Sequence, residues 1–170
     1  FLTSDRNLYY MSGHQAFYPW VSATRPVLML LPAGGEPVML THHVWHGAAV
    51  RDSWFPDVQG YGGLAGAPLD QVVAAFRERG VTQGRIGAEL GLEQRLGMPV
   101  ADFAALQDAL PAVEWVDAAD ILWELRLIKS PTEIEYIRQA CRATMHGFAT
   151  AFPTLRAGMT QEDVTRRLQA

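Results

Sequence analysis

The stretch DQVVAAFRERGVTQGRIGAE, residues 70–89, decides the fold class of this chain because it joins a helical pattern directly to a strand pattern. In its first half, Val72, Val73 and Phe76 recur at the spacing of one helix face. Gly80 follows, and glycine is the residue type that most often ends a helix. Residues 85–89 are then predicted to form a short strand.

The same order recurs further along the chain. Residues 99–110 carry apolar side chains at helical spacing, and residues 113–116 look extended. Asp117 can cap another helix, which we expect to reach Leu125. Helices that alternate with short strands are typical of a layered α/β domain.

Towards the N-terminus, a hairpin is predicted from two apolar runs, residues 27–31 and 38–40. Between them, Gly34 and Gly35 allow the backbone conformations that a tight reversal needs. Together with the segments above, this pattern predicts an α/β fold with a mixed sheet flanked by helices.

Composition and charge limit the partners that the chain can have. It has 170 residues, 49% of them hydrophobic, which suffices for one substantial core. A formal net charge of −4 provides no basic surface for phosphates, so no nucleic-acid partner is expected. The apolar run 27–31 is far too short to span a bilayer, and no membrane segment or secretory signal is predicted. The single cysteine, Cys141, excludes an internal disulfide and favours a cytoplasmic protein.

The organisation changes at residues 126–131, RLIKSP, which show neither a helical nor a strand period. Ser130 is predicted to cap a new helix, with Pro131 at its first position and Glu133 completing a capping box. We therefore divide the chain into an α/β domain, residues 1–125, a linker, residues 126–131, and the opening helices of a second domain, residues 132–170.

An apolar stripe at three- and four-residue spacing predicts that this helix is about 20 residues long. Its members are Ile134, Ile137, Cys141, Met145, Phe148 and Phe152. A further helix is predicted from Thr160, with Asp163 three residues later. The chain starts at Phe1 rather than Met and stops within that helix, so we expect a piece of a longer protein whose second domain continues past Ala170.

Three motifs carry a resemblance to a known family: residues 7–13, NLYYMSG; residues 126–140, RLIKSPTEIEYIRQA; and residues 158–163, GMTQED. They are similar to motifs of the creatinase, prolidase and aminopeptidase P family of metallohydrolases. The resemblance implies a creatinase-like N-terminal domain, of ribonuclease H-like fold, followed by truncated helices of a pita-bread α+β catalytic domain. It also implies a homodimer.

The resemblance further implies two divalent metal ions, Mn, Co or Zn, held in the parent protein by two Asp, one His and two Glu of the catalytic domain. None of these positions falls in this chain, so we expect it to contain no catalytic residue, no metal ligand and no cofactor. The acids after the linker lie in the first turns of predicted helices, where carboxylates act as caps. These acids are Glu133, Glu135, Glu162 and Asp163.

Aromatic side chains gather after the Ser12-Gly13 turn and again near Trp54. In the family that the chain resembles, a loop after this turn reaches the partner subunit's active site. Phe17, Tyr18 and Trp20 are therefore candidate substrate-binding residues, with core or dimer packing as the alternative interpretation.

Three other features have plainer explanations. His42, His43 and His46 include a one-turn pair, as some zinc sites do, but without a third ligand we interpret them as surface or interface residues, with adventitious metal binding as the alternative. Residues 60–66 are rich in glycine but lack the Lys-Ser/Thr of a phosphate-binding loop, so a flexible loop is expected. Cys141 lies on the apolar stripe and is expected to be a buried structural thiol.

The leading functional hypothesis, implied by the resemblance, is that the parent protein hydrolyses the peptide bond before proline in a peptide or small-molecule substrate. This chain would supply dimer contacts and pocket wall, and alone it should be inactive. Two alternatives stay open: a non-catalytic binding or dimerisation module, and a relative that hydrolyses a non-peptide C–N bond, such as that of creatine.

Overall fold

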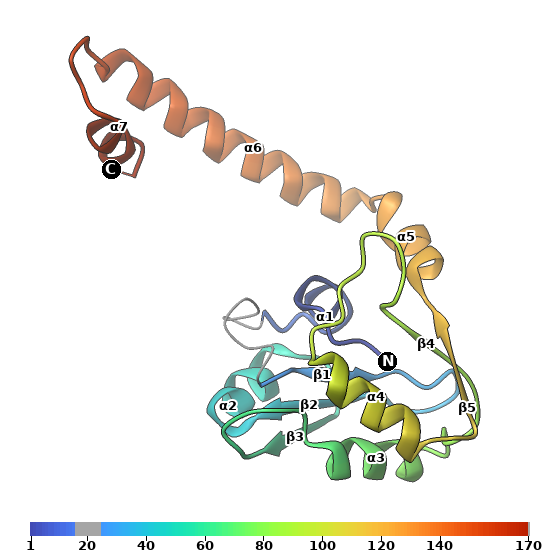
Figure 1. The fold of residues 1–170 in the computed structure, drawn as a ribbon. Coiled ribbons are helices and arrows are strands. Elements are labelled where there is room, and N and C mark those ends of the chain that lie inside the picture. The colour runs from blue at the N-terminus through green and yellow to red at the C-terminus, as the bar shows by residue number, and fades with distance from the viewer. Residues whose placement is uncertain (16–24, 170) are drawn as a thin grey trace. The chain divides into compact units, whose positions relative to one another are not determined.

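The computed structural model describes residues 1–15 and 25–169. It divides into two compact units, Phe1–Glu124 and Leu125–Ala170, which we call the first and the second unit. Each unit is described by itself below (Figure 1).

The predicted hairpin is confirmed in the first unit. Strand β1 (Leu28–Leu30) pairs antiparallel with β2 (Val38–His42), with Met29 opposite Met39. Strand β3 (Asp57–Tyr61) then pairs parallel to β2, so this three-stranded sheet is mixed. The sequence pattern did not reveal β3, because its side chains are mostly half-buried and do not alternate between apolar and polar.

A second small sheet contains the two other predicted strands. Strand β4 (Gly84–Ala88) pairs parallel with β5 (Val113–Asp117). Ala119 N–H donates a hydrogen bond to the Asp117 carboxylate at 2.9 Å, as expected for a residue that caps the following helix. The predicted fold class, α/β with a small mixed sheet flanked by helices, is confirmed.

Five helices accompany these strands: α1 (Asp5–Ser12), α2 (His43–Asp52), α3 (Leu69–Glu78), α4 (Val100–Ala109) and α5 (Ala119–Leu127). Helices α3 and α4 match the two predicted helices to within one or two residues. Gly80 ends α3 at a φ of 66°, and its N–H and that of Val81 bond back to Arg77 and Phe76. This pair of bonds is a Schellman motif, so the glycine is needed for its positive φ.

The core lies on both faces of the β1–β3 sheet because side chains alternate along each strand. Leu28, Leu30, Val38 and Leu40 pack with apolar residues of α3 and α4. Met29 and Met39 face the other way and pack with Leu8 of α1, Ala49 of α2 and Leu122 of α5. Figure 1 shows α1 and α3 on opposite sides of these strands.

Helix α5 (Ala119–Leu127) ends two residues later than predicted. Helix α5 continues through Arg126 to Leu127, so the first two residues of the predicted linker 126–131 are helical. The helix end was predicted too early because residues 126–131 show no helical spacing of apolar side chains. Exposed residues near the end of a helix need not show such spacing, and Leu127 is itself exposed.

The predicted start of the next helix is confirmed. Helix α6 (Pro131–Ala151) begins after Ser130, whose hydroxyl accepts from Glu133 N–H, while Ser130 N–H donates to the Glu133 carboxylate. These bonds, from the backbone first, lower the pKa of Glu133. A short 3₁₀ turn (Phe152–Thr154) and helix α7 (Gln161–Gln169) follow, and Thr160 and Asp163 bond reciprocally in the same way.

The prediction that Cys141 is buried is wrong. Its thiol is exposed, as are the other members of the apolar stripe on α6. The helical spacing was correct, but burial also requires a covering surface, and the described residues of the second unit do not form one.

Replacing Ser130 by alanine should loosen the start of α6 by about 1 kcal/mol, because it removes the acceptor for the Glu133 N–H. Amide hydrogen exchange at residues 132–136 measures this effect. Thr132→Ala, which alters an exposed neighbour, is the control. Unchanged exchange in S130A would show that the capping box does not hold this helix end.

Candidate functional site

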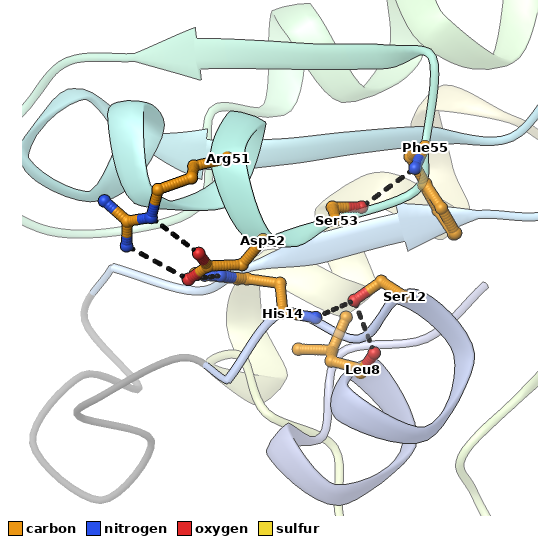
Figure 2. Close-up of polar contacts among 7 residues, drawn as sticks. All are labelled: Leu8, Ser12, His14, Arg51, Asp52, Ser53 and Phe55. Carbon is orange, nitrogen blue, oxygen red and sulfur yellow. Dashed lines mark hydrogen bonds and ion pairs between the residues drawn. The ribbon is translucent and has the colours of Figure 1, made fainter.

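The three candidate substrate-binding residues, Phe17, Tyr18 and Trp20, lie outside the described residues. The residues that lead into this segment are described, and they form the candidate site. They comprise the C-terminal end of α1, His14, and the end of α2 (Figure 2).

Helix α1 ends in a tight turn that the sequence motif NLYYMSG encodes. Gly13 adopts a φ of 77°, and its N–H bonds to Tyr9 O, which closes the helix. Such a left-handed residue is the usual end of a helix, and glycine adopts it without steric cost. Ser12 Oγ donates to Leu8 O at 2.7 Å and accepts from the His14 backbone N–H at 3.1 Å.

This helix end is bonded to the segment that follows α2. The backbone N–H of Trp54 donates to Ser12 O at 3.2 Å, and the Trp54 indole Nε1–H donates to Met11 O at 2.7 Å. Two carbonyls that the helix leaves without partners are therefore satisfied from outside it. The end of α1 is thus held against the connection between α2 and β3.

His14 is the first side chain beyond the turn, and it is buried, with 3% of its surface exposed. Its Nδ1 lies 3.7 Å from a carboxylate oxygen of Asp52, which itself pairs with Arg51 (Figure 2). Burial lowers the pKa of His14 from its ordinary value and outweighs the opposing effect of Asp52, which favours the neutral imidazole.

The arrangement around His14 suits positioning rather than bond cleavage. Neither ring nitrogen makes a hydrogen bond to any group in residues 1–15 and 25–169. The nearby hydroxyl of Ser12 is already occupied by Leu8 O and the His14 N–H, so it is not activated as a nucleophile. Sequence reasoning did not single out His14, since burial beside Asp52, 38 positions away, leaves no local pattern.

The three histidines lie where β2 passes into α2. His42 caps α2 by accepting from Val44 N–H, and its Nε2 bonds to Gly63 O at 3.0 Å. His46 Nε2 bonds to Val58 O at 3.0 Å. Two of the three rings are thus occupied by backbone carbonyls, and no three His, Cys, Asp or Glu side chains within the described part of the chain converge as metal ligands would.

The expected flexible loop at residues 60–66 is wrong for its first two residues, since Gly60 and Tyr61 end strand β3. A Cβ at Gly60 would lie 2.6 Å from Nδ1 of the exposed His43 side chain, which would have to turn aside. The Tyr61 hydroxyl donates to Pro26 O at 2.6 Å. Residues 62–66 lie outside regular structure.

The interpretation of the acids after the linker as caps is confirmed for Glu133 and Asp163. Glu135 forms an ion pair with Arg138 one turn away, and Glu162 lies in the first turn of α7.

Of the helices that the structure describes, none has the length and apolar composition that a bilayer crossing requires.

Comparison with known proteins identifies a family for most of the chain. Residues 1–128 match the family model described as the creatinase/prolidase N-terminal domain. Among curated protein sequences there is no match.

Among solved structures, the fold is similar to an X-Pro aminopeptidase from Thermotoga maritima, with a TM-score of 0.76 and 19% identity. The alignment covers 97% of this chain and 42% of that protein. A prolidase from Pyrococcus horikoshii has a TM-score of 0.73 and 18% identity, and an Xaa-Pro dipeptidase from Bacillus anthracis has 0.71 and 20%. In both cases the alignment covers 98% of this chain and 41% of the other. The chain thus spans well under half the length of these proteins.

Proposed function

Because this chain belongs to the creatinase/prolidase N-terminal domain family, we propose that it is the N-terminal part of a hydrolase that cleaves the peptide bond before proline. The family match over residues 1–128 carries this proposal. The similar solved structures support it, since their names specify X-Pro aminopeptidase, prolidase and Xaa-Pro dipeptidase activities.

The role of the chain in that hydrolase is support and shaping of the substrate pocket. Hydrolysis with two metal ions needs several carboxylates that converge on the same point. Residues 1–15 and 25–169 contain no group that fits such ions. From the family resemblance, we propose that two divalent ions are held by residues of a catalytic domain outside this chain, and no step through them is assigned to it.

Phe17, Tyr18 and Trp20 are the residues through which this chain would reach a substrate in a homodimer. The support for this proposal is the resemblance to the family and the firm attachment of the preceding residues. Ser12 Oγ accepts from the His14 backbone N–H, and Ser12 O and Met11 O accept from Trp54, so the described residues up to His14 are fixed against the segment that follows α2. Sedimentation of the full-length protein would test whether it is a dimer. We expect the protein to be cytoplasmic.

The full-length protein is expected to hydrolyse alanyl-proline and to lose this activity after dialysis against a chelator, whereas the 170-residue chain should be inactive under all conditions. Release of proline from alanyl-proline measures the activity of the full-length protein and of the 170-residue chain. Activity of the 170-residue chain that a chelator abolishes would contradict the division of roles. Creatine as a parallel substrate tests the C–N hydrolase alternative, and inactivity of the full-length protein towards both substrates would favour a binding module.

A further inference from the structure

Helix α1 begins without the cap that its sequence would normally provide. It has only eight residues, a length at which an isolated helix is not stable in water. Ser4 occupies the N-cap position, but its side chain makes no capping hydrogen bond. The backbone N–H groups at this end of the helix therefore need an acceptor from elsewhere in the fold.

For the N–H of Ser4, that acceptor is Glu89, which follows directly after β4 and is 2% exposed. One carboxylate oxygen, Oε2, accepts from Ser4 N–H at 2.8 Å, from Thr3 N–H at 2.6 Å and from the Thr3 hydroxyl at 3.0 Å. The other oxygen, Oε1, accepts from the Asn7 side-chain amide at 2.6 Å.

This arrangement reproduces one half of a capping box, the bond from the N-cap N–H to a carboxylate, with an acid from a distant part of the chain. In an ordinary box, the third helical residue is Glu, and its carboxylate accepts from the N-cap N–H. Here that position holds Asn7, which instead donates to Glu89, and Glu89 supplies the carboxylate across 85 residues to Ser4. A buried carboxylate is costly unless its oxygens are hydrogen-bonded. Here three bonds come from Thr3 and Ser4, directly before α1, and the fourth comes from Asn7 within the helix.

The two ends of α1 are therefore held by different sheets. Glu89 follows β4 of the two-stranded sheet, whereas Trp54, which bonds to Met11 and Ser12, precedes β3 of the three-stranded sheet. We propose that Glu89 is a positioning residue: by capping α1 from a distance, it sets the orientation of this helix and so the place where Gly13 and His14 leave it. The effect of Glu89 on the orientation of α1 does not depend on the function proposed above. Any effect of Glu89 on enzymatic activity rests on that proposed function.

A reciprocal exchange of the two side chains tests this inference. In E89Q, an amide NH₂ must face either the Asn7 NH₂ or the backbone N–H groups, so one set of bonds is lost. In N7D, two carboxylates face each other at the position of a 2.6 Å hydrogen bond. In the double variant N7D/E89Q, the amide introduced at position 89 can donate to the carboxylate introduced at position 7, while the amide oxygen still accepts from Thr3 and Ser4. The Gln94 amide, whose oxygen accepts from Asn7 at 3.0 Å, must turn so that its NH₂ faces the new carboxylate.

The readout is hydrogen exchange by NMR at the amides of Ser4 and α1 and at the indole N–H of Trp54, at the far end of the helix. Each single variant should accelerate exchange there by about tenfold, the usual consequence of losing one bond to a buried charged group. Amides of the β1–β2 pair should change much less. The double variant should return close to the native rates.

Equal acceleration throughout the first unit in E89Q, or a double variant no better than the worse single one, would overturn the inference. If E89Q does not fold, a folded double variant supports it and an unfolded one refutes it. In the full-length protein, E89Q should raise KM for alanyl-proline more than it lowers kcat, and the double variant should restore KM. Lack of activity in the native protein would refute the proposed function, while the exchange rates still test the role of Glu89.

Discussion

Phe76→Ala should lower the free energy of unfolding of the first unit by roughly 3–5 kcal/mol, the largest effect we expect from a single substitution in this chain. The Phe76 ring is completely buried on the inner face of α3. Its centroid lies 5.7 Å from that of Phe1 and 5.9 Å from that of Trp115, so truncation leaves a cavity among aromatic rings that cannot easily close. Denaturant unfolding followed by tryptophan fluorescence measures the loss.

The matched control is Ile121→Ala, which removes an exposed apolar side chain from α5 in the same unit. It should change the stability by less than about 1 kcal/mol. If the two variants were equally stable, the aromatic cluster around Phe76 would not be the main support of this core.

Gly97→Ala should destabilise the first unit by roughly 2–3 kcal/mol through overpacking. A Cβ at this position would lie 2.1 Å from the carbonyl oxygen of Thr3, and a backbone atom cannot turn away as a side chain can. The Gly97 N–H also donates to the Thr3 hydroxyl at 2.8 Å, so displacement of Thr3 breaks this bond as well. Thermal unfolding monitored by circular dichroism measures the change.

Gly34→Ala is the control for this substitution, since nothing lies within 4 Å of a Cβ added there. Its stability should stay within about 0.5 kcal/mol of the native value. Because Thr3 is also bonded to Glu89, Gly97→Ala should accelerate exchange at the start of α1 as E89Q does. Stability of G97A equal to that of G34A would mean that Thr3 and Gly97 are not in close contact.

The elements predicted correctly are those whose signals lie within the element. Helix α3 shows an apolar face over ten residues and a glycine shortly after it, and the β1–β2 hairpin shows two apolar runs around a Gly-Gly turn. In each case, the apolar residues that become buried lie within the segment itself. Their spacing along the sequence therefore predicts whether the segment is a helix or a strand.

The elements that were missed depend on partners far along the chain. Strand β3 has a glycine and half-buried side chains, and it forms because β2 offers a parallel edge for pairing. Helix α1 has too few residues to be stable alone. The error at Cys141 has the same origin, because helical spacing identifies a face but not what covers it.

The candidate site divides in the same way. The NLYYMSG motif marks the turn at Gly13, because a left-handed residue after a helix is a local requirement. The burial of His14 beside Asp52 arises from the approach of α2 to the end of α1, and no pattern around residue 14 announces it.

The starts of α6 and α1 show the physical difference most clearly. The residues that cap α6, Ser130 and Glu133, lie three positions apart, so a few residues of sequence suffice to predict the box and the position where the helix begins. The same local motifs, read as a set, indicate the family. The carboxylate that bonds to the start of α1 comes from Glu89, and it meets Ser4 only where the fold brings the end of β4 to this helix. Hydrogen bonds between neighbours in sequence are encoded locally, whereas those across 85 residues exist only in the folded chain.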